Sequence, residues 1–290
     1  MPTAKSFILD LLSTLPGGTM PVAALVEGSA LFGIAGNSLR VALSRLRTGG
    51  LVARDARGHY RLGPAARPIT GRVTAWRNLE QRVGPWEGGW IAALEPAPSP
   101  RGARRRRDHA LRLLGFRAVQ PRLSVRPDNL EGGIDTLRTE LVGLGLEARD
   151  LVFRLSGWDA ASEIRARGLW QSDRLPEAHQ RLRRQLEQSA RALRAEPPER
   201  AMTESFLLGG RAIRQLVLDP LLPDTIVPGK ERRALHATLR HYDRLGREAW
   251  AAFLARFDLP HRSAPADMQI GEATGQLSPT RTRMEETRRD

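Results

Sequence analysis

Apolar positions recur at helical spacing through the first 48 residues of the chain and alternate with polar positions in the residues that follow. The spacing predicts three helices, over residues 4–15, 21–32 and 36–48, with Pro16–Gly18 ending the first and Gly33 ending the second. The buried stripe of the third helix is Leu39, Leu43 and Leu46. The alternation predicts two short strands, over residues 51–56 and 59–63, joined by a turn at Asp55–Gly58.

Three helices followed by a hairpin describe a winged helix-turn-helix, whose third helix enters the DNA major groove. With its leucines turned inward, that helix presents side chains suited to base edges and phosphates: Asn37, Ser38, Arg40, Val41, Ser44, Arg45 and Arg47. The hairpin, or wing, adds side chains suited to phosphates: Arg54, Arg57, His59 and Arg61. The alternative is a solvated basic face on an ordinary helical subdomain, but helix number, spacing and hairpin together favour DNA binding.

Further along the chain, predicted strands and helices follow one another in the order β-α-β-α-β, which suits a small ferredoxin-like domain. One of these strands, over residues 117–127, contains Pro121 and is expected to be an edge or bulged strand. The fold class predicted is a multidomain α+β protein: a winged helix-turn-helix at 1–66, a linker at 67–88, a ferredoxin-like domain at 89–158, a C-terminal helical domain at 159–259 and a disordered tail at 260–290.

Net charge is consistent with DNA binding without deciding for it, and composition limits the other classes. The formal net charge is +14, which predicts an anionic partner, nucleic acid first and membrane surfaces second. An Arg-rich codon bias would produce the same excess, so the placement of the charges decides. The chain has no cysteine, which excludes disulfides and thiolate chemistry. Without an apolar run of about 18–20 residues or a cleavable signal, the chain is expected to be cytoplasmic, with no membrane partner.

Three stretches together resemble the PaaX-like transcriptional regulators, the repressors of phenylacetic acid catabolism. They are "NSLRVALSRLRTGGLV" from Asn37, "PWEGGW" with the later "LRLLGFRAVQPRLSVRP", and "DPLLPDTIVPG" at Asp219–Gly229. The resemblance covers nearly all of residues 5–258. Recognition helices in such proteins usually begin with a Ser or Thr cap. Here Ala35 and Gly36 precede Asn37, which is expected to cap the helix one residue late.

The resemblance implies an N-terminal winged helix, a middle domain with the ferredoxin-like fold of small CRISPR-associated nucleases, and a C-terminal helical domain. It also implies a homodimer that represses a catabolic operon and leaves double-stranded operator DNA when an aryl-acyl-CoA effector such as phenylacetyl-CoA binds. An acyl-CoA pocket needs apolar walls and cations for phosphates. The candidate residues in the C-terminal region are Trp158, Trp170, Phe206, Arg211 and Arg214, with core packing or surface charge as the alternative for each.

Enzyme chemistry finds less support in the sequence. A metal-dependent nuclease or nucleic-acid-processing protein built on the ferredoxin-like domain would need converging carboxylates, and only Glu95 and Asp108 are placed for that role. His236 and His241 are five apart, so they do not share a helical face as a metal pair would. We therefore predict no catalytic residue, no metal and no cofactor. The run Arg104–Arg107 fits DNA, CoA phosphates, a neighbouring subunit or solvent.

Overall fold

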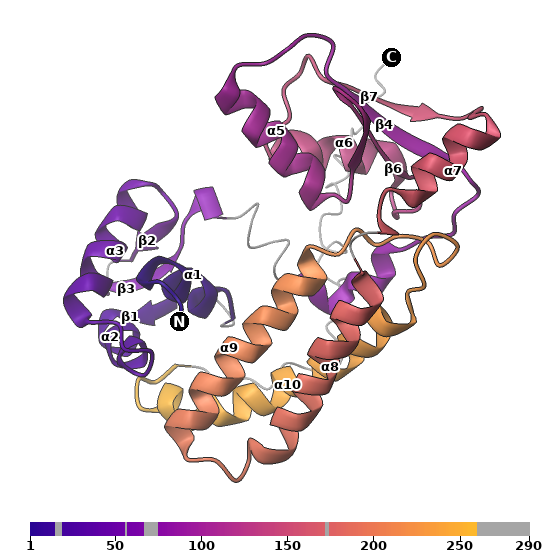
Figure 1. Cartoon of the computed structure of the whole chain (residues 1–290). Helices are drawn as coiled ribbons and strands as arrows, with labels where there is room; N and C mark the ends of the chain where they lie inside the picture. The colour runs from indigo at the N-terminus through magenta and orange to yellow at the C-terminus, as the bar shows by residue number, and fades with distance from the viewer. Residues whose placement is uncertain (15–18, 56, 67–74, 172–173, 260–290) are drawn as a thin grey trace, which may run out of the picture.

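The computed structural model describes residues 1–14, 19–55, 57–66, 75–171 and 174–259, which fold into three packed units (Figure 1). We call them the N-terminal unit (residues 4–66), the middle unit (90–155) and the helical unit (175–255). The predicted helix end at Pro16–Gly18, the first part of the predicted linker and the predicted tail at 260–290 lie outside the described residues. Across the described ranges, no helix has the length and apolar character needed to span a membrane.

The N-terminal unit combines three helices with a small antiparallel sheet of strand order β1-β3-β2. Its elements are α1 (Ala4–Thr14), β1 (Thr19–Pro21), α2 (Val22–Ala30), α3 (Gly36–Thr48), β2 (Val52–Arg54), β3 (His59–Leu62) and the 3-10 turn η1 (Pro64–Ala66). The sequence predicted β2 and β3 but not β1, because three residues ending in proline show no alternation. Met20, fully buried, anchors β1 against Tyr60 of β3.

The ends of α2 and α3 test two details of the sequence prediction. Gly33, at φ +69°, ends α2, and the amide of Ile34 donates to the Ser29 carbonyl at 3.1 Å. The predicted C-terminal glycine is therefore confirmed. The predicted cap at Asn37 is wrong: Ala35 is the N-cap of α3, without a side-chain bond, and Asn37 is already inside the first turn. An extended backbone at Ala35 (φ −62°, ψ 137°) is enough to start the helix one residue earlier.

The middle unit has a four-stranded antiparallel sheet of order β5-β6-β4-β7 with two helices. Its elements are β4 (Trp90–Leu94), α5 (Arg101–Leu113), β5 (Arg117–Gln120), β6 (Leu123–Pro127), α6 (Gly133–Gly143) and β7 (Leu151–Leu155). The single strand predicted over 117–127 is wrong. Pro121 cannot donate to the ladder and Arg122 takes φ +68°, so the chain turns there and forms two strands. The expected edge and bulge are both present in β5.

Both faces of this sheet are covered, which explains why all five residues of β4 are apolar and the first four are buried. Ile91 and Ala93 pack under α5 and α6. Trp90 and Ala92 pack on the opposite face against Trp170, which follows α7 (Ala160–Gly168), and against the loop 219–229. The region after residue 158 therefore completes the core of the middle unit.

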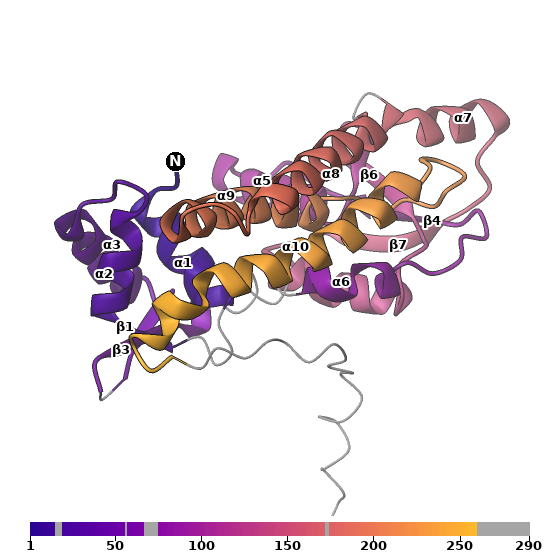
Figure 2. The same ribbon diagram turned by 90° about the horizontal axis from the view of Figure 1, so that it is seen from below.

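Three long helices form the helical unit (Figure 2): α8 (Leu175–Ala192), α9 (Pro198–Val217) and α10 (Lys230–Ala255). They lie within residues 159–259, which the sequence predicted to be helical. The 3-10 segment η2 (Ala75–Arg82) inserts Trp76 and Leu79 into their core, so this part of the predicted linker is packed. The domain boundaries at residues 66, 88, 158 and 259 stay a prediction.

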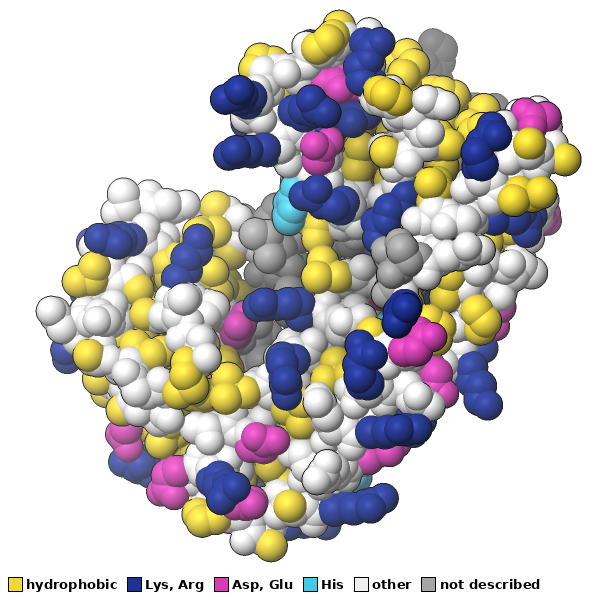
Figure 3. Space-filling view, in the orientation of Figure 1, with side chains coloured by type: hydrophobic (Ala, Val, Ile, Leu, Met, Phe, Trp, Pro, Cys, Tyr) yellow, Lys and Arg dark blue, Asp and Glu magenta, His cyan; other side chains and the backbone are white. Residues whose placement is uncertain are grey.

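The N-terminal unit shares its core with the far ends of α9 and α10. The ring of Phe206 on α9 lies 5.6 Å from that of Phe7 and 5.0 Å from that of Phe32, and Trp250 of α10 follows at 6.0 Å. An ion pair between Arg256 and Glu27, at 2.6 Å, lies beside this aromatic cluster. The contact leaves the molecule hollowed between the N-terminal and middle units (Figure 3).

A buried guanidinium joins the middle unit to the loop 219–229. Arg126, 1% exposed, donates to the carbonyls of Leu114, Pro127 (3.1 Å) and Pro220 (3.4 Å) and to the amide oxygen of Asn129 (3.1 Å). Asn129 in turn donates to the Leu221 carbonyl at 2.7 Å. The turn at Pro220 lies so close to Gly115 that a Cβ there would be 2.9 Å from Pro220.

Replacing this guanidinium should cost much more stability than replacing an exposed one. Arg126→Met removes the donor from several buried carbonyls, and we expect a loss on the order of 3 kcal/mol in the free energy of unfolding. Arg154→Met is the control, because its exposed side chain pairs with Asp128 at 3.0 Å and should cost less than about 1 kcal/mol. Urea unfolding of the two variants measures the difference, and equal losses would contradict the role given to Arg126.

Candidate nucleic-acid interface

The helix α3 presents a continuous polar surface to solvent. Its buried residues are Leu39, Leu43 and Leu46, the three that the sequence predicted. All seven side chains expected on the outward face are exposed: Asn37, Ser38, Arg40, Val41, Ser44, Arg45 and Arg47. Val41 is 44% exposed, although its side chain is apolar and has no polar group that needs contact with water. An apolar side chain at the centre of a polar face suits a thymine methyl group.

Helical periodicity orders these side chains across the exposed surface. Arg40 and Arg47, seven residues apart, lie on one flank, and Ser38 and Arg45 lie on the other. Asn37, Val41 and Ser44 lie between them. Thr48, which the sequence analysis did not select, is exposed on the same central line, with its hydroxyl donating to the Ser44 carbonyl at 3.1 Å. Its position one helical turn after Ser44 would have identified Thr48 from the sequence.

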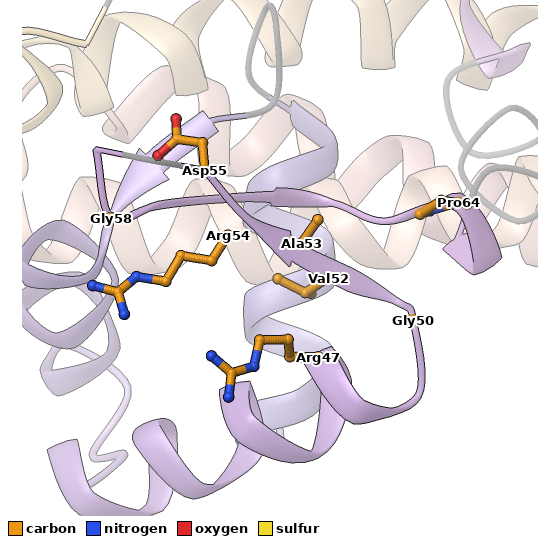
Figure 4. Close-up of a pocket in the computed structure, with 8 residues that line it drawn as sticks. All are labelled: Arg47, Gly50, Val52, Ala53, Arg54, Asp55, Gly58 and Pro64. Atoms are coloured by element: carbon orange, nitrogen blue, oxygen red, sulfur yellow. The ribbon is translucent and has the colours of Figure 1, made fainter.

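An open groove separates the end of α3 from the β2–β3 hairpin (Figure 4). Its volume is about 700 Å³, and Arg47 from α3 and Arg54 from β2 both line it. The guanidinium of Arg54 lies 5.9 Å from the Tyr60 ring, which holds the side chain along the hairpin. Two cations therefore face one groove from two different elements.

The hairpin turn is held by one carboxylate. Asp55 accepts hydrogen bonds from the backbone amides of Arg57 at 3.0 Å and His59 at 2.8 Å. These bonds fix the direction of the turn and leave the Arg57 side chain exposed at its tip. From residue 31 to residue 63, Asp55 is the only acidic residue, against six arginines. Its charge is used within the turn.

The hairpin residues selected from the sequence do not share one face. Arg54 pairs with Tyr60 in the ladder and therefore lies on the face that continues from Val52 towards α3. Arg61 pairs with Ala53 on one side and Thr19 on the other, so it lies on the opposite face, together with His59. A surface that includes α3 and the groove thus takes in Arg54, whereas His59 and Arg61 are turned away from that groove.

The residues selected for an effector pocket have different neighbours. Trp170 is buried, stacks on Trp90 with ring centroids 6.2 Å apart, and donates to the Gly115 carbonyl at 3.2 Å. Phe206 belongs to the aromatic cluster under the N-terminal unit. Trp158 is half-buried, and Arg211 and Arg214 are exposed on α9. None of them lines the α3 groove or the small cavity behind Asp219, and their effector role stays a prediction.

Comparisons with known proteins match both ends of the chain. A family model described as PaaX-like protein matches residues 3–66, and one described as PaaX-like protein C-terminal domain matches residues 170–261, together more than half of the 290 residues. A solved structure titled "Uncharacterized protein Rv0674 from Mycobacterium tuberculosis" is 25% identical, with a TM-score of 0.54, over 88% of this chain and 97% of that one. The curated proteins give no match.

The geometry of the hairpin turn predicts a local effect of changing Asp55. Asp55→Ala removes the acceptor of two amides, and we expect the amides of Arg57 and His59 to exchange about fivefold faster, for a loss of about 1 kcal/mol. Asp55→Asn keeps the acceptor oxygen and should exchange close to the wild-type rate. Hydrogen exchange followed by NMR distinguishes them, and slow exchange in both variants would contradict the assignment.

Proposed function

Since the chain belongs to the PaaX-like family of transcriptional regulators, we propose that it is a repressor that binds the operator of a catabolic operon through α3 and the β2–β3 hairpin. The observation that carries this proposal is the exposed face of α3, where all seven side chains chosen for DNA contact reach solvent beside a groove with two arginines. DNA-binding regulators need such a face because bases are read by side chains projecting from one helix.

The proposal includes the identity of the two mixed units. We take the N-terminal unit to be a winged helix-turn-helix, with the hairpin as its wing, on the basis of its element order and its sheet order β1-β3-β2. We take the middle unit to be ferredoxin-like, on the basis of its β-α-β-β-α-β order and its sheet order β5-β6-β4-β7.

In this mechanism α3 lies in the major groove and the wing lies over the backbone. Arg40 suits the O6 and N7 atoms of guanine, and Asn37 suits adenine. Arg47 and Arg54, facing one groove of the protein, suit a phosphate that passes between α3 and the wing. We further propose a homodimer, whose two-fold axis would match an inverted repeat with half-sites spaced by whole helical turns.

Release from DNA is proposed to follow binding of an aryl-acyl-CoA such as phenylacetyl-CoA. The effector must favour the arrangement of units that cannot bind DNA, typically by about 1–3 kcal/mol of coupling. The shared aromatic core of Phe7, Phe32 and Phe206 supports such coupling, since a shift of α9 moves the N-terminal unit with it. This mechanism places the protein in the cytoplasm, with DNA and metabolites.

The carboxylates that the nuclease alternative requires already contact other side chains of the protein. Glu95 accepts a hydrogen bond from the Ser99 hydroxyl, which lowers the pKa of that carboxyl despite its burial. The guanidinium of Arg107 lies 3.8 Å from Asp108 and 3.1 Å from Asp150. It therefore already supplies positive charge to these two carboxylates. These contacts support our proposal that the protein is not an enzyme.

The test is binding to the DNA upstream of its own gene, compared with random DNA of equal length, over a range of salt concentrations with and without phenylacetyl-CoA. Preference for the upstream fragment, relieved by the thioester, is the expected result. Preference without relief would remove the effector and keep the regulator. Equal and salt-sensitive binding to both fragments would overturn the operator-binding proposal.

Two arginine substitutions should separate base contacts from phosphate contacts. Arg40→Ala should cost about 1–3 kcal/mol on the operator and relax base preference at one position. Arg57→Ala, at the wing tip, should weaken binding to operator and random DNA alike and reduce the salt slope by about one unit. Fluorescence anisotropy on both fragments measures this. If Arg40→Ala loses as much on random DNA as on the operator, the base contact is wrong.

A further inference from the structure

The helix α5 of the middle unit carries more positive charge than its packing requires. Among the 13 residues of α5, six are arginine and one is aspartate. One arginine, Arg107, is used inside the protein: it is 4% exposed, bonds Asp150 at 3.1 Å and reaches the carbonyls of Ala93 and Arg122. The other five point outwards. The sequence alone left the whole run from Arg104 to Arg107 as one group, and the structure divides it.

The outward arginines form a ridge along the helix. Ala103, Ala110 and Leu111 mark the buried side of α5. By helical periodicity the line farthest from that side passes through four exposed residues, Arg101, Arg105, His109 and Arg112, which we call the α5 ridge. At a rise of 1.5 Å per residue the ridge is about 16 Å long, a length over which one strand of B-DNA presents about five phosphates.

The charges of the ridge are free to meet a partner. Across the described ranges, Arg101, Arg105 and Arg112 form no ion pair. Two acidic side chains pair with other arginines of this region: Asp108 lies 3.8 Å from Arg107, and Glu147 lies 3.8 Å from Arg106 and 2.9 Å from Arg149. A row of uncompensated cations on one helix raises the local positive potential.

The shape and composition of the ridge select among anionic partners. Its side chains stand in a line on a convex helix, whereas a small phosphate ligand needs groups that converge on a cavity. A helix that binds a membrane surface needs apolar residues beside its cations, and the outward line of α5 has none. An extended polyanion fits both observations. In Figure 3 the Lys and Arg side chains over α5 gather at the rim of the hollow that faces the N-terminal unit.

We propose that the α5 ridge is a second DNA-contacting surface, which binds backbone phosphates outside the base pairs that α3 reads. The proposal rests on the proposed function, because it requires that DNA bound by α3 continues along the protein to the middle unit. The ridge adds affinity without sequence preference, since phosphates carry no base information. It also extends the length of DNA that one protomer occupies.

The experiment compares two triple variants with equal loss of charge. Arg101→Ala with Arg105→Ala and Arg112→Ala removes the ridge. Arg181→Ala with Arg184→Ala and Arg191→Ala removes three exposed arginines of α8 and is the control. Affinity is measured against salt on two fragments, one trimmed to the base pairs read by α3 and one extended several helical turns on each side.

We expect the ridge variant to lower the salt slope on the extended fragment by about two to three units, and to match wild type on the trimmed fragment. The α8 variant should match wild type on both. An unchanged slope on the extended fragment, or an equal drop in the α8 variant, would overturn the proposal. Loss of the phenylacetyl-CoA response at an unchanged slope would also overturn it, in favour of a small anion.

Failure of the proposed function would look different. In that case wild type would show no preference for the upstream fragment and Arg40→Ala would change nothing, whatever the ridge does to the slope. A ridge effect on random extended DNA, together with a preference of wild type for its own operator, supports both. Circular dichroism of each triple variant checks that folding is intact, as exposed substitutions should leave it.

Discussion

The arrangement of the molecule depends on the buried guanidinium of Arg126. A charge in a protein interior is tolerated only when its donors are satisfied, and here the acceptors come from two parts of the chain, Leu114 and Pro127 in the middle unit and Pro220 in the loop 219–229. That requirement fixes the loop against the sheet. The same loop ends at α10, and Asp219 within it bonds the Leu221 amide at 2.8 Å and lies 3.0 Å from His179. The middle and helical units are thereby joined by polar contacts that have little freedom to slide.

The other junction, under the N-terminal unit, is of a different kind. Phe7, Phe32, Phe206 and Trp250 meet as tilted rings, and the polar contact beside them is the ion pair of Arg256 with Glu27. Aromatic contacts of this type tolerate small rotations, because many tilted arrangements have similar energy. The proposed release from DNA requires two arrangements of the N-terminal unit, and one stiff junction with one adaptable junction would allow both.

Local pattern was sufficient to predict the three helices of the N-terminal unit, the β2–β3 hairpin and the buried leucines of α3, since each depends on periodicity within a few residues. It failed where the deciding contact is distant. Strand β1 exists because Met20 finds Tyr60, and β5 and β6 separate because Arg122 turns the chain, neither of which alternation reveals. In the candidate site, the exposure of α3 could be predicted from the sequence. That Arg54 and Arg61 lie on opposite faces of the hairpin could be seen only from the pairing register of the strands. The burial of Arg107 could not be predicted locally, because its partner Asp150 is 43 residues away in the sequence.

The long helix α10 connects the two junctions. Its first turn follows the loop that Arg126 holds, and its last turns carry Trp250 and Phe253 under the N-terminal unit. With 26 residues it is about 39 Å long, and it is packed at both ends. A tilt of about 5° at the loop would displace the far end by about 3.4 Å, which is one base-pair step along DNA. Under the proposed release mechanism, such a tilt would be enough to shift α3 by one base-pair step relative to the operator.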